Sequence, residues 1–341
     1  RFKFDNVVME EAGQILEIET FIPLMLQSSD VVDGHRLKRV TLIGDHHQLP
    51  PVVKNPLLAS AGNLDQSMFA RLIRLGVPAV VLNAQGRMRP ELRSLFSWRY
   101  PELGDLPHVE AANSRFAAPN PGFAHTFQLV NVDDYQGEGE RTPSPHYYQN
   151  LGEAEYAAAV FMFMRACGYR GDQIAVLTTY NGQRALLEDV FRARCGDNPL
   201  YGMPAAISTV DKFQGQQADF VLLSLVRTRA IGHVRDVRRL VVALSRARLG
   251  LYVFCRAALF SDCYELAPAF TQLLAAAPDA KLAIKPAALR LAAAGETATK
   301  PSDDVEIVDD VAAMGALVYD VTMKMLAAER ARPPPPPAST Q

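Results

Sequence analysis

Short apolar segments recur along the chain, and longer stretches with helical apolar spacing separate them. The short segments fit buried strands at residues 7–9, 40–43, 80–82, 127–130, 174–178, 207–210, 220–223 and 251–254, and residues 305–308 suggest one further strand. The longer stretches fit amphipathic helices at residues 153–167, 182–194 and 312–326. Because strands that alternate with helices form parallel sheets covered on both faces, the expected fold class is α/β.

The pattern divides the chain into two α/β units followed by a less regular end. We expect an incomplete first unit in residues 1–90 and a second unit in residues 91–265. An alanine-rich C-terminal extension then occupies residues 266–328. Residues 329–341 contain five consecutive prolines and predict an extended tail, which would either aid solubility or bind an SH3- or WW-type domain.

Composition narrows the class of protein. A chain of 341 residues with 49% hydrophobic and 21% charged residues is ordinary for a soluble enzyme, and no apolar run reaches the roughly 18 residues that would cross a membrane. Adjacent His46 and His47 lack the spacing of metal ligands. The cysteines also lack that spacing and favour free thiols in a reducing compartment: Cys167, Cys195, Cys255 and Cys263.

Local charge differs from the net charge of −2. Seven arginines and one acidic residue, Asp236, lie between Arg227 and Arg248. Such a run fits either a solvated face or an anion-binding surface.

Asn150 and Glu153 precede the helical stretch at 153–167 with the spacing of a capping box. We expect the Asn150 side chain to accept a hydrogen bond from the backbone of Glu153. The Glu153 side chain would in turn bond to the backbone amide of Asn150.

Polar residues follow the first two predicted strands directly. Glu10 and Glu11 fit either a polar cap or a Walker B element, in which one carboxylate holds Mg²⁺ and the next orients the attacking water. The second strand ends at Gly44, which lets the backbone approach a ligand. Asp45 and Gln48 follow, and they could organise a metal-bound water and contact a phosphate.

Two clusters later in the chain have the residue types of a nucleic-acid or phosphate site. Arg87 leaves a strand–helix junction. Thr178, Thr179 and Tyr180 follow a buried strand and precede an Asn-Gly turn. These hydroxyls and this aromatic ring suit backbone contacts and base stacking on a single strand, although an ordinary turn explains them equally well.

The last cluster is the arginine-rich segment at residues 238–248. With helical geometry, Arg239, Ala243 and Arg246 would fall on one side of a helix, since they are four and three residues apart. An arginine that one domain points at a nucleotide held by another acts as an arginine finger.

In order and spacing, these clusters resemble motifs II to VI of superfamily 1 helicases, in the subgroup of the nonsense-mediated-decay helicase and senataxin. The resemblance rests on five strings: EEAGQ from Glu10, GDHHQLPP from Gly44, QGRM from Gln85, TVDKFQG from Thr209 and VALSRAR from Val242. Residues 98–108, 148–156 and 227–239 further resemble the intron-binding helicases of the spliceosome. The similarity covers residues 1 to about 270 well.

The resemblance implies tandem RecA-like domains of a P-loop helicase, the first incomplete, with ATP and Mg²⁺ as cofactors. Glu11 would be the catalytic base, Gln48 would sense the γ-phosphate, and Arg87 and Arg246 would face it, while Glu10 would hold Mg²⁺. The implied ATP-binding residues are Glu10, Gln14, Gly44, Asp45, Gly215, Gln217 and Arg248. The implied RNA-binding residues are Thr178, Thr179, Tyr180, Thr209 and Gln214.

The implied function is ATP-dependent RNA translocation or unwinding in pre-mRNA splicing. The partners would be the pre-mRNA intron and spliceosomal proteins, the location nuclear, and no membrane would be involved. A superfamily 1 DNA helicase and a non-catalytic helicase-like scaffold remain alternatives.

Three positions depart from the family pattern, and all three concern the nucleotide. Glu10 replaces the usual Asp, Gly86 stands where an aromatic ring would stack on adenine, and Gln217 replaces a Glu. We expect looser recognition of base and sugar. No Gly-Lys pair of a P-loop occurs in the chain, so its P-loop is expected before residue 1, and the chain by itself is expected to lack ATPase activity.

Overall fold

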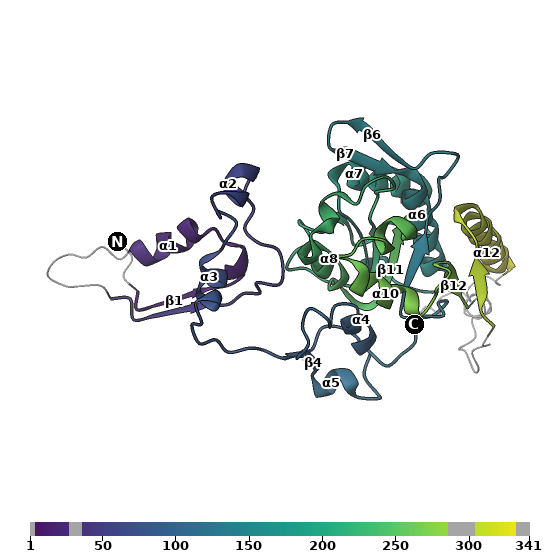
Figure 1. Ribbon diagram of the computed structural model, residues 1–341. Coiled ribbons are helices and arrows are strands. Elements are labelled where there is room, and N and C mark those ends of the chain that lie inside the picture. The colour runs from purple at the N-terminus through teal and green to yellow at the C-terminus, as the bar shows by residue number, and fades with distance from the viewer. Residues whose placement is uncertain (1–3, 27–35, 286–303, 332–341) are drawn as a thin grey trace, which may run out of the picture. The chain divides into compact units, whose positions relative to one another are not determined.

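The computed structural model describes residues 4–26, 36–285 and 304–331, which divide into two compact units (Figure 1). The first unit is Arg1–Asn83 and the second is Ala84–Gln341. Among the described helices, none is long and apolar enough to cross a membrane.

The first unit is built on two short parallel strands. Val7 of β1 (Asn6–Met9) pairs with Val40 of β2 (Arg39–Leu42). The Asn55 side chain caps α2 and the Ser67 side chain caps α3. The helices of this unit are η1 (Ala12–Gln14), α1 (Glu17–Met25), α2 (Pro56–Ser60) and α3 (Met68–Arg74).

Two strand predictions in this unit are wrong in part. The strands at 7–9 and 40–43 exist but are only partly buried: Met9 is buried, whereas Val8 is 64% and Val40 is 42% exposed. Two strands pair only with each other in the described residues, so most of their surface stays uncovered. Residues 80–82 form no strand in the structure, and Val80 is 92% exposed.

The second unit contains a five-stranded sheet, which confirms the α/β class with a parallel sheet. All of its strands are parallel, in the order β5-β11-β10-β8-β9. Leu222 in the central strand pairs with Val176 on one side and Tyr252 on the other. The strands are β5 (Phe127–Asn131), β8 (Ile174–Thr178), β9 (Ala206–Thr209), β10 (Ala218–Ser224) and β11 (Ala247–Cys255).

Helix α6 (Leu151–Ala166) packs against β10 and β11, and α7 (Asn181–Phe191) against β8 and β9. The prediction that this helix is amphipathic is wrong, because twelve of the sixteen residues of α6 are buried. Its outer side is covered by α12 (Val311–Ala331), through buried Met314, Val318 and Val321 (Figure 1). A helix covered on all sides has no polar face to preserve.

The start of α6 confirms only half of the predicted capping box. The Asn150 side chain accepts from the Glu153 amide at 3.1 Å, as expected. The Glu153 carboxyl does not return to the Asn150 amide, which donates instead to Gln183 at 2.7 Å. Glu153 is drawn toward the end of β10, where it meets Ser224 and Val226.

The C-terminal segment joins the same core. Strand β12 (Leu282–Ile284) pairs with β13 (Glu306–Val308) and docks beside β5, where Gln128 exchanges two hydrogen bonds with Ala283, at 3.0 and 2.7 Å. Helices α9 (Ala257–Ser261) and α10 (Ala267–Ala275) also pack against β5. Most of the predicted tail, residues 332–341, lies outside the described residues.

The remaining elements of the second unit are short. A hairpin is formed by β6 (Glu140–Ser144) and β7 (Tyr147–Asn150). The others are β3 (Ala84–Gln85), α4 (Pro90–Ser94), β4 (Gly104–Asp105), α5 (Pro107–Glu110), η2 (Gly171–Gln173), η3 (Arg192–Gly196), η4 (Gly232–Arg235) and α8 (Val237–Leu244).

Candidate nucleotide and nucleic-acid sites

In the first unit, the predicted site residues gather where β1 and β2 end. Glu10 is exposed and makes no ion pair with any described residue. Glu11 has a φ of 53°, which turns the chain sharply after the strand. Its carboxylate accepts a hydrogen bond from Gln14 Nε2 at 3.0 Å.

A close approach of two backbones brings the second cluster to the first. A Cβ on Gly44 would lie 2.7 Å from the amide nitrogen of Gly13, so only glycine fits there. The Ala12 amide donates to the Ile43 carbonyl at 2.9 Å. Asp45 then accepts from Gln48 Nε2 at 2.8 Å, which fixes the direction of the Gln48 amide.

These residues fit a Mg²⁺ ion that arrives with a nucleotide. Such an ion needs only one or two protein carboxylates, because phosphates and waters complete its shell. Glu10 supplies one carboxylate. The rings of His46 and His47 are tilted against each other with their centroids 4.1 Å apart, and the described residues hold no cluster of three potential ligands.

In the second unit, a first group of predicted residues lies at the amino ends of β10 and β11. Arg246 is buried, with Nε on the Val242 carbonyl at 2.9 Å and Nη1 on the Gln216 carbonyl at 3.1 Å. Arg87 Nη1 reaches the Ser245 carbonyl at 3.3 Å. The structure therefore brings the segments around Arg87, Gln216 and Arg246 together.

The predicted helical face through Arg246 is wrong. Helix α8 ends at Leu244, and Arg246 lies in the turn before β11. Arg239, expected on the same face, pairs with Asp211 at 3.1 Å instead. A helix that ends two residues earlier places the guanidinium beside Gln216 rather than along the helix.

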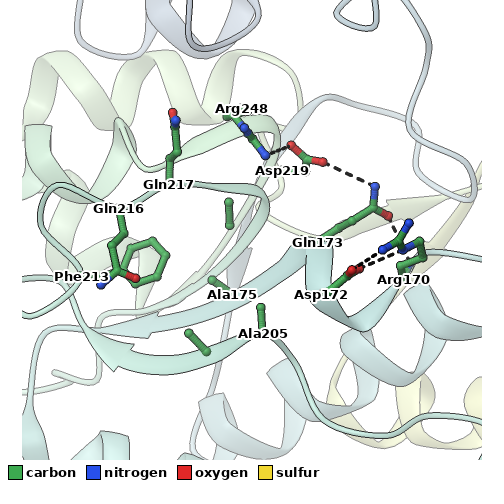
Figure 2. A pocket seen from close by; sticks show the side chains of 12 residues that line it. Arg170, Asp172, Gln173, Ala175, Ala205, Phe213, Gln216, Gln217, Asp219 and Arg248 are labelled. Carbon is green, nitrogen blue, oxygen red and sulfur yellow. Dashed lines mark hydrogen bonds and ion pairs between the residues drawn. The ribbon is translucent and has the colours of Figure 1, made fainter.

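A pocket of about 300 Å³ opens beside this group (Figure 2). Its wall includes Gln217 and Arg248, two predicted ATP-binding residues. Arg248 is held at 2.7 Å by Asp219, which also pairs with Arg115. The predicted Gly215, two residues before Gln217, has a φ of +75° with open space around it.

Gly86 meets an imidazole in this structure. A Cβ at Gly86 would lie 2.8 Å from Cε1 of His108, and His108 Nε2 lies 3.2 Å from the Gly86 carbonyl. The space that an aromatic side chain at position 86 would need is therefore filled by His108 and Leu106.

A second group of predicted residues lies at the carboxyl ends of β8 and β9. Thr178 and Thr209 are paired in register, and Thr179 follows. The buried hydroxyls of Thr178 and Thr179 and the Nε2 of Gln214 have no hydrogen-bond partner in the described part of the chain. An unsatisfied buried polar group costs about 1–3 kcal/mol, and a bound ligand or a water is one way to satisfy it.

Tyr180 completes the carboxyl-end group through residues that the sequence did not single out. Its hydroxyl accepts from Arg227 Nη1 at 3.3 Å, and its ring lies 5.0 Å from that of Tyr148. Arg227 also pairs with Glu140 at 2.8 Å. Burial raises the pKa of Glu140, but the hydrogen bonds from Arg227 and Thr228 outweigh it and lower the pKa overall.

Comparison with known families identifies the chain. An AAA domain profile matches residues 64–258, and a second AAA domain profile matches residues 1–56. The chain belongs to the AAA domain family. The two matched ranges contain every candidate residue described above, and together with the parallel sheet they fit tandem RecA-like domains.

Similarity to curated proteins places this AAA-family chain in the predicted helicase subgroup. It is 53% identical to RNA helicase aquarius of Mus musculus over 95% of this chain and 22% of that protein. It is 32% identical to the pre-mRNA-splicing factor cwf11 of Schizosaccharomyces pombe, over 76% of this chain and 20% of that protein. It is 33% identical to a Regulator of nonsense transcripts 1 homolog of Drosophila melanogaster, over 74% of this chain and 21% of that protein.

The chain thus spans about a fifth of the length of these relatives. Among solved structures, a PRRSV helicase matches over 74% of this chain and 35% of that one, with 17% identity. Its TM-score of 0.35 is too low to carry an argument about this chain.

Proposed function

We propose that this chain is the nucleotide- and RNA-facing part of an ATP-dependent RNA helicase that acts in pre-mRNA splicing. The proposal is supported by similarity to a protein named RNA helicase aquarius and to a pre-mRNA-splicing factor. The partners would be pre-mRNA intron RNA and spliceosomal proteins, and the location would be the nucleus.

The observation that carries the proposal is the separation of two polar groups on one parallel sheet. Arg246, with Arg87 nearby, lies at the amino ends of the strands, while the hydroxyls of Thr178 and Thr179, which find no partner among the described residues, lie at the carboxyl ends. Guanidinium groups match phosphate charge, and hydroxyls match the sugar–phosphate backbone. One sheet can then link nucleotide state to RNA position.

In the first unit, Glu11 would activate the attacking water and Gln48, oriented by Asp45, would contact the γ-phosphate. ATP and Mg²⁺ supply the transferable phosphate and the charge that neutralises it. Glu10 would hold that Mg²⁺. The remaining proposed ATP contacts are Gln14, Gly44, Gly215, Gln217 and Arg248.

In the second unit, Arg87 and Arg246 would stabilise charge that develops on the transferred phosphate. Tyr180, Thr209 and Gln214 would join Thr178 and Thr179 along the RNA.

Paired variants of the full-length protein test the proposal. Arg246→Ala should lower kcat of RNA-stimulated ATP hydrolysis at least about a hundredfold. Arg192→Ala is the control. Arg192 is an exposed arginine whose ion pair with Asp189 is long, at 3.8 Å, and lies on the surface. That control should hydrolyse ATP at the wild-type rate.

Valine at Thr178 and Thr179 tests the RNA side separately. Removing an unsatisfied buried hydroxyl should leave thermal stability unchanged or raised. The RNA concentration for half-maximal stimulation should nevertheless rise. Unchanged RNA dependence would remove these residues from the RNA site, and equal stimulation by single-stranded DNA would favour the DNA helicase.

A non-catalytic scaffold is the second candidate, and two observations favour it. Gln217 replaces a carboxylate, and His108 fills the space beside Gly86 where an aromatic ring would be expected. RNA binding without any ATP hydrolysis by the full-length protein would support the scaffold.

A further inference from the structure

The chain makes an unusual turn immediately after β10. Val226 has a φ of 75°, and the Arg227 amide donates to the Leu225 carbonyl at 2.9 Å across it. This is a γ-turn with positive φ at its centre, which is rare. For a β-branched residue such as valine the conformation costs about 1–3 kcal/mol, so neighbouring groups must hold it.

The first turn of α6 holds both peptide groups of Val226. The Val226 amide donates to the Glu153 carboxyl, at 2.9 Å to Oε2 and 3.1 Å to Oε1. The Val226 carbonyl accepts from Asn150 Nδ2 at 3.2 Å. The Ser224 hydroxyl adds a third bond, to Glu153 at 2.6 Å.

Gln183 at the start of α7 closes the network. Its Nε2 donates to the Asn150 carbonyl at 2.9 Å and to the Ser224 hydroxyl at 3.1 Å. Asn150, Glu153, Gln183 and Ser224 are all at most 2% exposed. A buried polar network whose members are satisfied fixes one geometry, because no water can replace a lost partner.

The held turn sets the position of Arg227. Its Nε donates to Glu140 at 2.8 Å and its Nη1 to the Tyr180 hydroxyl at 3.3 Å. Its guanidinium also lies 4.0 Å from the ring centroid of Tyr148. Tyr180 directly follows Thr179, so Arg227 connects the turn to the carboxyl end of β8.

We propose that Glu153 is a positioning residue for RNA: its buried carboxyl holds Val226 in the γ-turn, and the turn places Arg227 against Tyr180 at the carboxyl end of β8, where the proposed RNA contacts lie. This inference rests on the proposed RNA-binding function of that edge. Glu153 does not touch RNA itself, since both oxygens of its carboxyl are engaged by Ser224 and the Val226 amide.

The positioning role is separable from a purely structural one. Glu153→Leu keeps the apolar packing of α6 but removes every acceptor for Val226. The full-length variant should bind single-stranded RNA about tenfold more weakly, by fluorescence anisotropy without nucleotide. Glu153→Gln keeps one oxygen for the Val226 amide and an amide for Ser224, so it should retain wild-type affinity.

Glycine at position 226 provides the decisive rescue. Glycine adopts a positive φ without strain, so Val226→Gly should restore RNA affinity to the Glu153→Leu protein. The same substitution removes a buried side chain and should lower the thermal unfolding temperature further. Affinity and stability then move in opposite directions, which a merely structural role does not predict.

Matched variants complete the test. Glu155→Leu makes the same exchange on α6 at a carboxylate that pairs with Arg194, and it should leave RNA affinity unchanged. Arg227→Lys should weaken RNA binding even if Glu153→Leu fails to fold. Loss of affinity in Glu155→Leu equal to that in Glu153→Leu, or no rescue by glycine, overturns the positioning role.

A readout without RNA separates this inference from the proposed function. Hydrogen exchange of the peptide that contains Tyr180 should speed up in Glu153→Leu and slow again with Val226→Gly. If wild-type protein binds no RNA, the proposed function fails, and with it the RNA role of Glu153. If the wild-type protein binds RNA but Glu153→Leu changes neither the hydrogen exchange of the Tyr180 peptide nor the RNA affinity, only the positioning role fails.

Discussion

Glu153 is fully buried and accepts several hydrogen bonds. Burial and these hydrogen bonds shift the pKa of its carboxyl in opposite directions. Burial raises the pKa of Glu153 to about 8, although the bonds from Ser224 and Val226 act to lower it. The free carboxyl of an unfolded chain titrates near 4.5. The folded chain therefore holds a proton that the unfolded chain releases between these two values.

This difference predicts a pH dependence of stability. Between about pH 4.5 and 8 the folded state binds more protons, so the free energy of unfolding should fall as pH rises, by on the order of 4 kcal/mol. Chemical denaturation of this chain at pH 5 and pH 8 measures the slope. Glu153→Gln cannot titrate and should lose most of it; an equal slope in that variant would contradict the assignment.

Gly44 is the second residue at which local geometry makes a sharp prediction. In Gly44→Ala the new methyl would press on the Gly13 amide at 2.7 Å, so the ends of β1 and β2 would separate. The full-length variant should lose most ATP hydrolysis. Gly315→Ala is the control: among the described residues, nothing beyond the adjoining helix backbone and chain neighbours comes within 4 Å of the added methyl, and alanine should stabilise α12 by up to about 1 kcal/mol.

At the scale of elements, the start of α6 carries more than a helix cap. The Asn150 side chain accepts from the Glu153 amide at 3.1 Å and donates to the Val226 carbonyl at 3.2 Å. Ser67, the cap of α3, accepts from the Ala70 amide at 3.1 Å and from no other donor in the described part of the chain. The two caps should therefore differ in what their loss costs.

Alanine substitution measures that difference. Ser67→Ala should lower the free energy of unfolding by about 1 kcal/mol, as a lost cap does. Asn150→Ala should cost about 2–3 kcal/mol, because a buried carbonyl also loses its donor. Urea unfolding of this chain compares them, and equal losses would show that the Val226 contact contributes little.

Sequence patterns predicted the elements best where one sheet buries them fully. The strand at 174–178 matches β8, whose five residues are all buried. A short, continuously apolar segment is typical of a strand inside a parallel sheet that helices cover on both faces. The run at 80–82 looks the same in sequence but finds no strand partner in the described residues. The pairing of Glu153 with Val226 could not be predicted, since it joins residues 73 positions apart.

The candidate site likewise contains residues that the sequence motifs predicted and residues that only the structure reveals. Motif order predicted a set of site residues, and the structure brings the segments around two of them, Arg87 and Arg246, together through Ser245 and Gln216. The sequence did not assign roles to Arg227 and Tyr148: Arg227 was noted only as part of the arginine-rich run, and Tyr148 only as the start of the string 148–156. Their contacts depend on a backbone turn that no periodicity reveals.

At the scale of the whole molecule, the C-terminal helix is part of the second unit. Met314 of α12 is fully buried in the core that also includes α6. Met314→Ala should therefore lower the free energy of unfolding by about 2–4 kcal/mol. Tyr319 on the same helix is 68% exposed, and Tyr319→Ala should change stability little. Equal effects would mean that α12 does not pack as described.

RNA-stimulated ATP hydrolysis by the full-length protein, measured beside Glu11→Gln, tests the central claim most directly. Single-stranded RNA should raise the hydrolysis rate, and Glu11→Gln should abolish the stimulated rate while RNA still binds. A wild-type protein that binds RNA but hydrolyses no ATP, or a Glu11→Gln protein with full activity, would contradict it.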